Sequence, residues 1–165
     1  MSMRLYHFDY EYNKQILLEE AKQLEGYKPF VDPHPQSDLV FDDWQIKHVH
    51  LEENSSPYAI EVANYFQDLL DVKIEPRFYY QKPNFTLPFH QDRGTLCSIN
   101  LVLTENPEPI TFEDGTEYYR IALLNTQQRH SITTKKTERR LYKLSIKEYD
   151  FEEIRNRLKE KQHEA

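Results

Sequence analysis

The feature that most constrains this chain is a change of pattern near residue 74. From there onward, apolar and polar residues alternate with a period of two, and β-branched and aromatic residues gather in short runs. Turn-forming residues separate the runs, and Asp114-Gly115, between ITFE and TEYYRIALL, is the strongest hairpin signal. Strands that follow one another through tight turns pair antiparallel and close into sandwiches or barrels. We therefore expect a mainly β fold, with about six to eight short strands in residues 74–148.

Helical patterns flank this β region. Apolar residues recur at helical spacing in residues 11–25 and again near 56–70. Ser56 is suited to cap the second helix, and Pro57 fits its first position. A last amphipathic helix is expected over about 150–161. The two N-terminal helices are expected to cover one outer face of the sheet.

The length of 165 residues and the mass of 20.0 kDa suit one domain with one core. Apolar residues make up 38% and aromatic residues 13%, which suffices for a folded core and excludes disordered and fibrous classes. We expect a single domain over 1–165. Within it, 1–73 would be a helical N-terminal support, 74–148 the β core that carries the site, and 149–165 a C-terminal helix.

Charge and glycine content argue against two large classes of function. The 21 basic and 28 acidic residues give a net charge of −7, which makes a nucleic-acid partner unlikely because such affinity rests on neutralised phosphates. The basic cluster of Lys135, Lys136, Arg139 and Arg140 fits a solvated loop and strand start. With three glycines in the whole chain, a Gly-rich phosphate loop is also excluded.

Cysteine usage and hydropathy bear on location. The single cysteine, Cys97, cannot form an internal disulfide, and it lies in an apolar run that fits a core strand. No stretch approaches the roughly 18 apolar residues that span a membrane, and the N-terminal segment lacks the apolar region of a secretory signal. These features favour a cytoplasmic protein without a membrane partner.

Two histidines and one aspartate form the candidate metal site. His90 and Asp92 occupy positions i and i+2 in FTLPFHQDRG, so in a strand both side chains point to one face. His130 begins a later run of the same β region. Two histidines and one carboxylate on adjacent strands form the facial triad of non-haem Fe(II) sites. A structural zinc site fits less well, because such a site usually takes four protein ligands, often cysteines, and this chain has one cysteine.

An arginine follows in the last predicted strand, RRLYKLSIK. The face that carries Arg140 also carries Tyr142, Leu144 and Ile146, and it is the more apolar of the two faces. We therefore expect this face to point into the barrel, which buries Arg140. A buried guanidinium needs an anion, and its fork suits a carboxylate. Because Arg139 is adjacent, a register shift of one residue would exchange the two arginines.

Taken together, these motifs resemble the 2-oxoglutarate- and Fe(II)-dependent oxygenase superfamily, in particular its small prolyl-hydroxylase-like or aspartyl-hydroxylase-like members. The resemblance covers residues 74–147 and implies a double-stranded β-helix core, which is a jelly roll like that of cupins. It implies that His90, Asp92 and His130 bind iron and that Arg140 binds the distal carboxylate of 2-oxoglutarate. Tyr80, ten residues before His90, stands where such relatives often carry a cosubstrate-side tyrosine, although ordinary packing explains it equally well.

The activity implied by this resemblance is hydroxylation of an amino-acid side chain in a protein, a peptide or a free amino acid, with 2-oxoglutarate and O₂ as cosubstrates. Two alternatives remain open: a non-catalytic jelly-roll binding module, and a cupin-like metalloprotein that does not use 2-oxoglutarate. Tyr142 is a possible neighbour of the cosubstrate, and Ser98 and Asn100 form a polar strand face that could line the pocket. A competing metal pair, His48 and His50 followed by Glu52, reads better as an exposed edge.

Overall fold

The computed structural model describes residues 4–24, 26–31, 40–53, 55–92, 94–105 and 108–163. Three helices lie in these ranges: α1 (Lys14–Gln23), α2 (Pro57–Leu70) and α3 (Phe151–His163). The strands of the same ranges are β1 (Leu5–His7), β2 (Lys28–Val31), β3 (Val40–His48), β4 (Glu75–Gln81), β5 (Thr86–His90), β6 (Cys97–Val102), β7 (Ile110–Phe112), β8 (Gly115–Glu117), β9 (Ile121–Leu124), β10 (His130–Thr133) and β11 (Arg139–Ile146).

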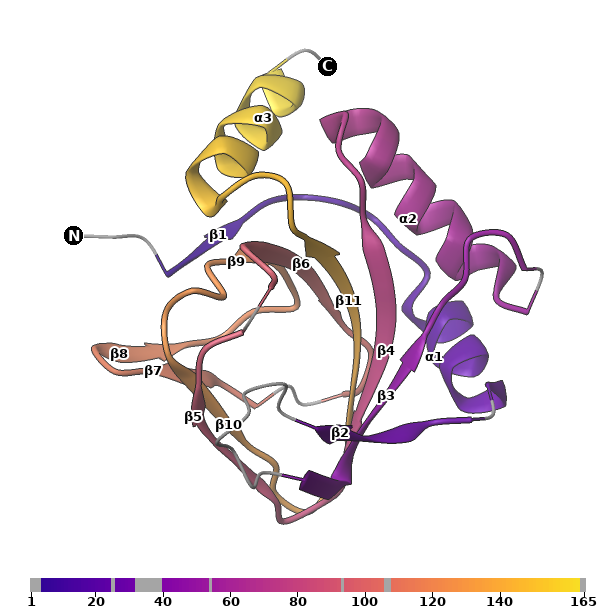
Figure 1. Ribbon diagram of the computed structural model, residues 1–165, viewed down its shortest axis with the longest axis vertical. Helices are drawn as coiled ribbons and strands as arrows, with labels where there is room; N and C mark the ends of the chain where they lie inside the picture. Colours follow the sequence, from indigo (N-terminus) through magenta and orange to yellow (C-terminus); the bar gives the residue numbers. More distant parts are fainter. Residues whose placement is uncertain are drawn as a thin grey trace.

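Two antiparallel sheets form the core of the fold. The larger sheet has the order β1-β9-β6-β11-β4-β3-β2, and the smaller has the order β5-β10-β7-β8. Neighbours in each sheet are mostly distant in sequence, so the chain crosses repeatedly between the two sheets (Figure 1). This arrangement is a jelly roll, and the mainly β fold with flanking helices is confirmed. The hairpin predicted at Asp114-Gly115 joins β7 to β8, with Phe112 paired to Gly115.

The helices cover one face of the larger sheet (Figure 1). Their apolar faces bury Leu17 of α1, Phe66 of α2 and Ile154 of α3 in one cluster with sheet residues such as Phe78 and Leu144. A second, smaller cluster lies between the two sheets. It draws from both of them: Leu5, Trp44, Tyr79, Val102, Ala122, Leu124 and Leu141 from the larger, and Leu87, Ile110, Phe112 and Ile132 from the smaller. The larger sheet therefore has a helix-facing side and a barrel-facing side.

The N-terminal part of the chain is less helical than the sequence predicts. Besides α1 and α2, residues 1–73 contribute β1, β2 and β3, which lie at the two edges of the larger sheet. The helical N-terminal support expected over 1–73 thus also contains three strands. The sequence analysis missed these strands because tertiary pairing forms them: β1 pairs with β9, and β3 pairs with β4.

The start of α2 is capped by a residue of another helix. Pro57 occupies the first turn as predicted, but the Ser56 side chain makes no capping hydrogen bond. Instead the buried carboxylate of Glu20 in α1 accepts hydrogen bonds from the backbone N–H groups of Tyr58 and Ala59, both at 2.9 Å. A carboxylate is favoured at this position because helix N-termini carry unpaired N–H groups and a partial positive charge. This contact also fixes α1 against α2.

Candidate metal centre and cosubstrate pocket

The smaller sheet brings both candidate histidines together. His90 is the last residue of β5 and His130 the first of β10, and the two are paired across the antiparallel ladder. Their rings lie 4.4 Å apart, centroid to centroid. Asp92 follows two residues after His90, and its backbone N–H donates to the carbonyl of Thr126. Residues forty positions apart thus meet at one end of the barrel.

Backbone carbonyls fix the tautomer of each histidine. Nδ1 of His90 lies 2.8 Å from the carbonyl oxygen of Pro88, and Nδ1 of His130 lies 2.8 Å from that of Gln128. A carbonyl oxygen only accepts hydrogen bonds, so Nδ1 carries the proton in both rings. The lone pair of each neutral imidazole is then on Nε2, the atom that a metal ion would bind.

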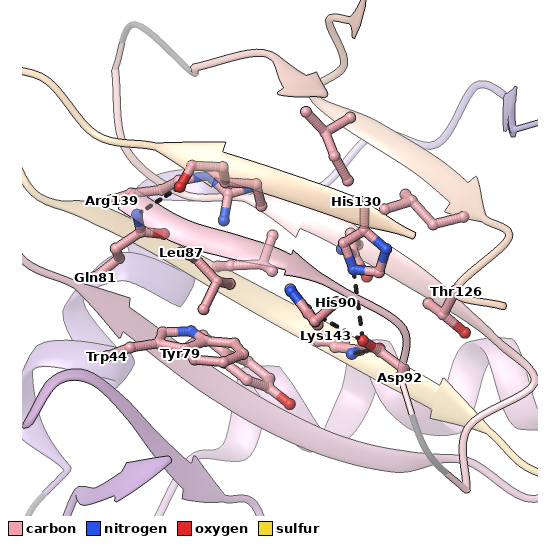
Figure 2. Close-up of a pocket in the computed structure, with 15 residues that line it drawn as sticks. Trp44, Tyr79, Gln81, Leu87, His90, Asp92, Thr126, His130, Arg139 and Lys143 are labelled. Carbon is pink, nitrogen blue, oxygen red and sulfur yellow. Dashed lines mark hydrogen bonds and ion pairs between the residues drawn. The ribbon is translucent and has the colours of Figure 1, made fainter. Parts of the chain in front are cut away.

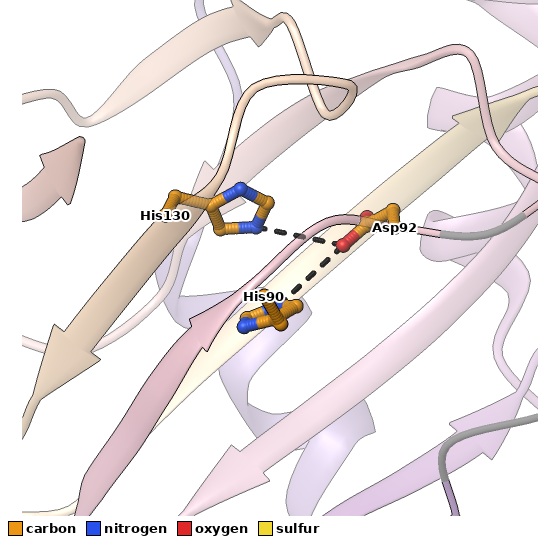
Figure 3. A group of neighbouring side chains, drawn as sticks. All are labelled: His90, Asp92 and His130. Carbon is orange, nitrogen blue, oxygen red and sulfur yellow. Dashed lines mark ion pairs between the residues drawn. The ribbon is translucent and has the colours of Figure 1, made fainter. Parts of the chain in front are cut away.

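Both Nε2 atoms point to the same carboxylate oxygen. Oδ1 of Asp92 lies 3.5 Å from Nε2 of His90 and 3.5 Å from Nε2 of His130 (Figure 3). One ligand atom from each of these residues lies within 4.8 Å of the others. Ligands bonded side by side to one ion at about 2.1 Å lie about 3 Å apart, so a small closure would seat a cation.

We call His90, Asp92 and His130 the His-Asp-His group. Three lone-pair donors that converge in a half-buried site favour a shared cation, and this donor set suits Fe(II). Among the described residues it is the one such group of histidine, cysteine and carboxylate ligands. The residues therefore fit a metal ion, and their role as ligands stays a prediction.

A buried lysine adjoins the group. The Lys143 ammonium of β11 donates to Oδ2 of Asp92. Burial alone raises the pKa of Asp92, but the positive charge of Lys143 opposes it, and this pKa lies well below its usual value. Burial likewise lowers the pKa of Lys143, and the Asp92 charge raises it above its usual value. The pair is therefore ionised.

The structure places Arg139, rather than Arg140, in the pocket. One pocket is lined by the His-Asp-His group and Lys143 at one end and by Arg139 and Gln81 at the other (Figure 2). Arg139 is buried, and its Nη2 donates to the hydroxyl of Tyr119 at 3.0 Å. Its Nε is buried and has no hydrogen-bond partner. An unpartnered buried guanidinium nitrogen in a pocket is suited to bind an anion.

The predicted orientation of this last strand is therefore wrong. Tyr142, Leu144 and Ile146 pack in the cluster between the larger sheet and the helices, and the Tyr142 hydroxyl donates to the carbonyl of Ala59 at 2.7 Å. The more apolar face of β11 meets the helices, so the more polar face lines the barrel. Tyr142 thus lies outside the pocket.

Arg140 and Tyr80 also lie on the side of the larger sheet that faces away from the pocket. The two are cross-strand partners, and the guanidinium carbon of Arg140 lies 4.9 Å from the centroid of the Tyr80 ring. Nε of Arg140 donates to Glu138 at 2.6 Å. Both residues line a depression on the opposite side of the sheet, together with Tyr27 of the segment after α1. Neither residue reaches the pocket of the His-Asp-His group, so we do not carry the predicted cosubstrate role to them.

Polar residues behind Arg139 extend the site. Asn100 lines the pocket, as its strand face suggested, and its amide donates to the Tyr119 hydroxyl at 3.2 Å. Ser98 donates to Oδ1 of Asn100 at 2.8 Å but does not line the pocket. The sequence analysis placed Tyr119 in the strand run TEYYRIALL and gave it no role in the site, whereas it lies in the short connection between β8 and β9.

Aromatic side chains form the wall near His90. Trp44 of β3 lies 5.7 Å from the His90 ring and 5.8 Å from Tyr79 of β4, centroid to centroid. The sequence reading passed over Trp44 because β3 itself was not predicted. The competing pair His48 and His50 is exposed and lines a separate surface depression.

No protein-family model matches the chain, and no curated protein matches it. Among solved structures, a Trichoplax adhaerens prolyl hydroxylase in complex with a hypoxia inducible factor peptide fragment is similar, with a TM-score of 0.66 and 11% identity, over 87% of this chain and 80% of that one.

Two further solved structures have a similar fold. A Pseudomonas putida prolyl-4-hydroxylase has a TM-score of 0.59 and 13% identity, over 82% of this chain and 88% of that one. A Burkholderia pseudomallei oxidoreductase of the 2OG-Fe(II) oxygenase family has a TM-score of 0.58 and 9% identity, over 82% of this chain and 79% of that one. At such identities the likeness concerns the fold. The chain therefore has the jelly-roll fold of the prolyl hydroxylases and other 2OG-Fe(II) oxygenases.

Proposed function

We propose that this chain is a non-haem Fe(II) oxygenase that depends on 2-oxoglutarate and O₂ and hydroxylates an amino-acid side chain. The observation that carries the proposal is the convergence of two Nε2 atoms and Oδ1 of Asp92 in a pocket that also holds Arg139. A ferrous ion held by the His-Asp-His group would supply the O₂ chemistry that side chains lack. Three protein ligands leave three coordination positions open.

Arg139 is the proposed anchor for the distal carboxylate of 2-oxoglutarate. Its Nη2 is held by Tyr119, and its Nε faces no partner. A carboxylate bound here gains charge-assisted hydrogen bonds in a site with little water. This feature favours a 2-oxoglutarate enzyme over a cupin-like metalloprotein without this cosubstrate, because a buried arginine in the pocket is suited to bind the second carboxylate of a dicarboxylate cosubstrate.

The substrate is proposed to be a protein, a peptide or a free amino acid. One structural neighbour is a prolyl hydroxylase that holds a peptide fragment, which supports a peptide substrate by analogy of fold. The aromatic wall of Trp44 and Tyr79 beside His90 suits an apolar or ring-bearing side chain.

No helix in the described ranges is long and apolar enough to cross a membrane.

The test is release of succinate from 2-oxoglutarate by the Fe(II)-loaded protein in the presence of a peptide library. We expect succinate formation that rises with a productive peptide and is lost in Asp92→Ala. The matched control is Asp68→Ala, an acidic residue of α2 outside the site, which should retain activity. Absence of succinate with every peptide and with free amino acids, despite bound iron, would favour the non-catalytic binding module.

A further inference from the structure

The two oxygens of the Asp92 carboxylate face different partners. Oδ1 lies 3.5 Å from Nε2 of both His90 and His130. Oδ2 accepts a hydrogen bond from the Lys143 ammonium. The side chains of Asp92 and Lys143 are each 12% exposed, so water competes little for either group. A carboxylate placed in this way offers one oxygen to the candidate metal position and the other to the lysine.

Lys143 is held in this place by the sheet. On β11 it pairs with Asn100 of β6 on one side and with Arg77 of β4 on the other. Its ammonium lies 5.4 Å from the centroid of the Tyr79 ring. A buried ammonium needs a compensating charge, and separation of such a pair is strongly unfavourable. We therefore expect Oδ2 to stay with Lys143 when a cation meets Oδ1.

The contact between Lys143 and Asp92 affects how many positions of a bound metal ion stay open. Aspartate binds metal ions through one oxygen or through both. A facial triad leaves three open positions, and a second oxygen from Asp92 would take one of them. A chelating cosubstrate and O₂ together need all three. We propose that Lys143 is a positioning residue that restricts Asp92 to coordination through one oxygen and so keeps the third position open. This inference rests on the metal site of the proposed function.

The first test uses the wild-type chain loaded with Zn(II), so it does not depend on how a variant folds. Coordination through one oxygen separates the antisymmetric and symmetric carboxylate stretching bands more widely than coordination through two. The bands of Asp92 are identified by ¹³C labelling of aspartate and by their loss in Asp92→Asn. We expect a wide separation when Zn(II) binds, and a narrow separation would overturn the proposal.

The second test compares Lys143→Met with Lys147→Met. Lys147 directly follows the end of β11, is 47% exposed and pairs with Glu75, so its loss removes a lysine away from the His-Asp-His group. With Mn(II) bound, water-proton relaxation reports the number of coordinated waters. We expect this number to fall by about one third in Lys143→Met as Asp92 chelates, and to stay at the wild-type value in Lys147→Met. A wild-type value in both variants would contradict the role of Lys143.

The two proposals fail in different ways. If wild-type protein binds neither Mn(II) nor Zn(II), the metal site is absent and both proposals are overturned. If the metal binds and Asp92 already chelates with both oxygens in the wild type, only the role of Lys143 is overturned. Succinate release then still decides the proposed function.

Discussion

Arg139 and Arg140 are neighbours in β11, yet their guanidinium groups lie on opposite faces of the larger sheet. Arg139 is buried in the pocket of the His-Asp-His group and contacts Tyr119, whereas Arg140 stacks on Tyr80 on the other side. The alternation of side chains along a strand requires this separation. The pair therefore offers an internal comparison in which one arginine tests the site and the next tests the surface.

Arg139→Gln should weaken the binding of 2-oxoglutarate by about 30-fold or more, because loss of one partner of a buried charge pair costs roughly 2–5 kcal/mol. Arg140→Gln should leave the affinity near the wild-type value. Calorimetric titration of 2-oxoglutarate into Mn(II)-loaded protein measures both. A larger loss in Arg140→Gln than in Arg139→Gln would return the cosubstrate role to the residue that the sequence favoured.

Tyr119→Phe should weaken 2-oxoglutarate binding roughly ten-fold, because the hydroxyl accepts hydrogen bonds from both Arg139 and Asn100 and orients the guanidinium. Metal affinity should not change. Tyr118→Phe is the matched control, since Tyr118 is adjacent and 66% exposed. Equal affinity in the two variants would mean that Tyr119 does not position Arg139.

The error at β11 shows where sequence reasoning reaches its limit. The face with Tyr142, Leu144 and Ile146 is the more apolar, which the sequence shows correctly. A sheet of this fold buries both faces, however, and the helices take the more apolar one. The polar face then lines the pocket, because ligands need charged partners. Knowing which face meets the helices requires the tertiary arrangement.

The His-Asp-His group was easier to predict. The sequence placed His90 and Asp92 two residues apart and His130 at the start of a run in the same β region; Asp92 lies two residues beyond the end of β5, yet its carboxylate still meets both imidazoles. Trp44 and Tyr119 depend instead on β3 and on a short connection, whose places are set by long-range pairing. The Glu20 cap of α2 was missed for the same reason, since its partners are 38 and 39 residues away.

Glu20→Gln should destabilise the fold by about 1 kcal/mol, because the carboxylate caps α2 with two hydrogen bonds and its charge favours a helix N-terminus. Thermal unfolding should show a fall in Tm of a few degrees. Glu19→Gln, an exposed neighbour, should be close to neutral. An unchanged Tm in Glu20→Gln would show that the inter-helix cap contributes little.

The thiol of Cys97 should stay protonated in the folded state well into alkaline conditions. Burial, with a smaller contribution from Asp150, raises the pKa of Cys97 from 9.0 to about 12. The folded state thus binds this proton more tightly, and the associated stability is present below pH 9 and is lost as the pH rises towards 12. The urea concentration at the midpoint of unfolding should therefore fall between pH 9 and pH 12. In Cys97→Ala it should fall less steeply, because only the other titrating groups then contribute. Equal slopes would contradict the raised pKa.

The most direct test of the central claim is anaerobic titration of 2-oxoglutarate into the Fe(II)-loaded protein. If His90, Asp92 and His130 hold the ion and Arg139 holds the distal carboxylate, a visible metal-to-ligand charge-transfer band should grow to saturation. The band should be lost in His130→Ala and retained in His50→Ala, which changes an exposed histidine outside the site. A wild-type protein that binds Fe(II) without the band, or a band that survives His130→Ala, would contradict the account.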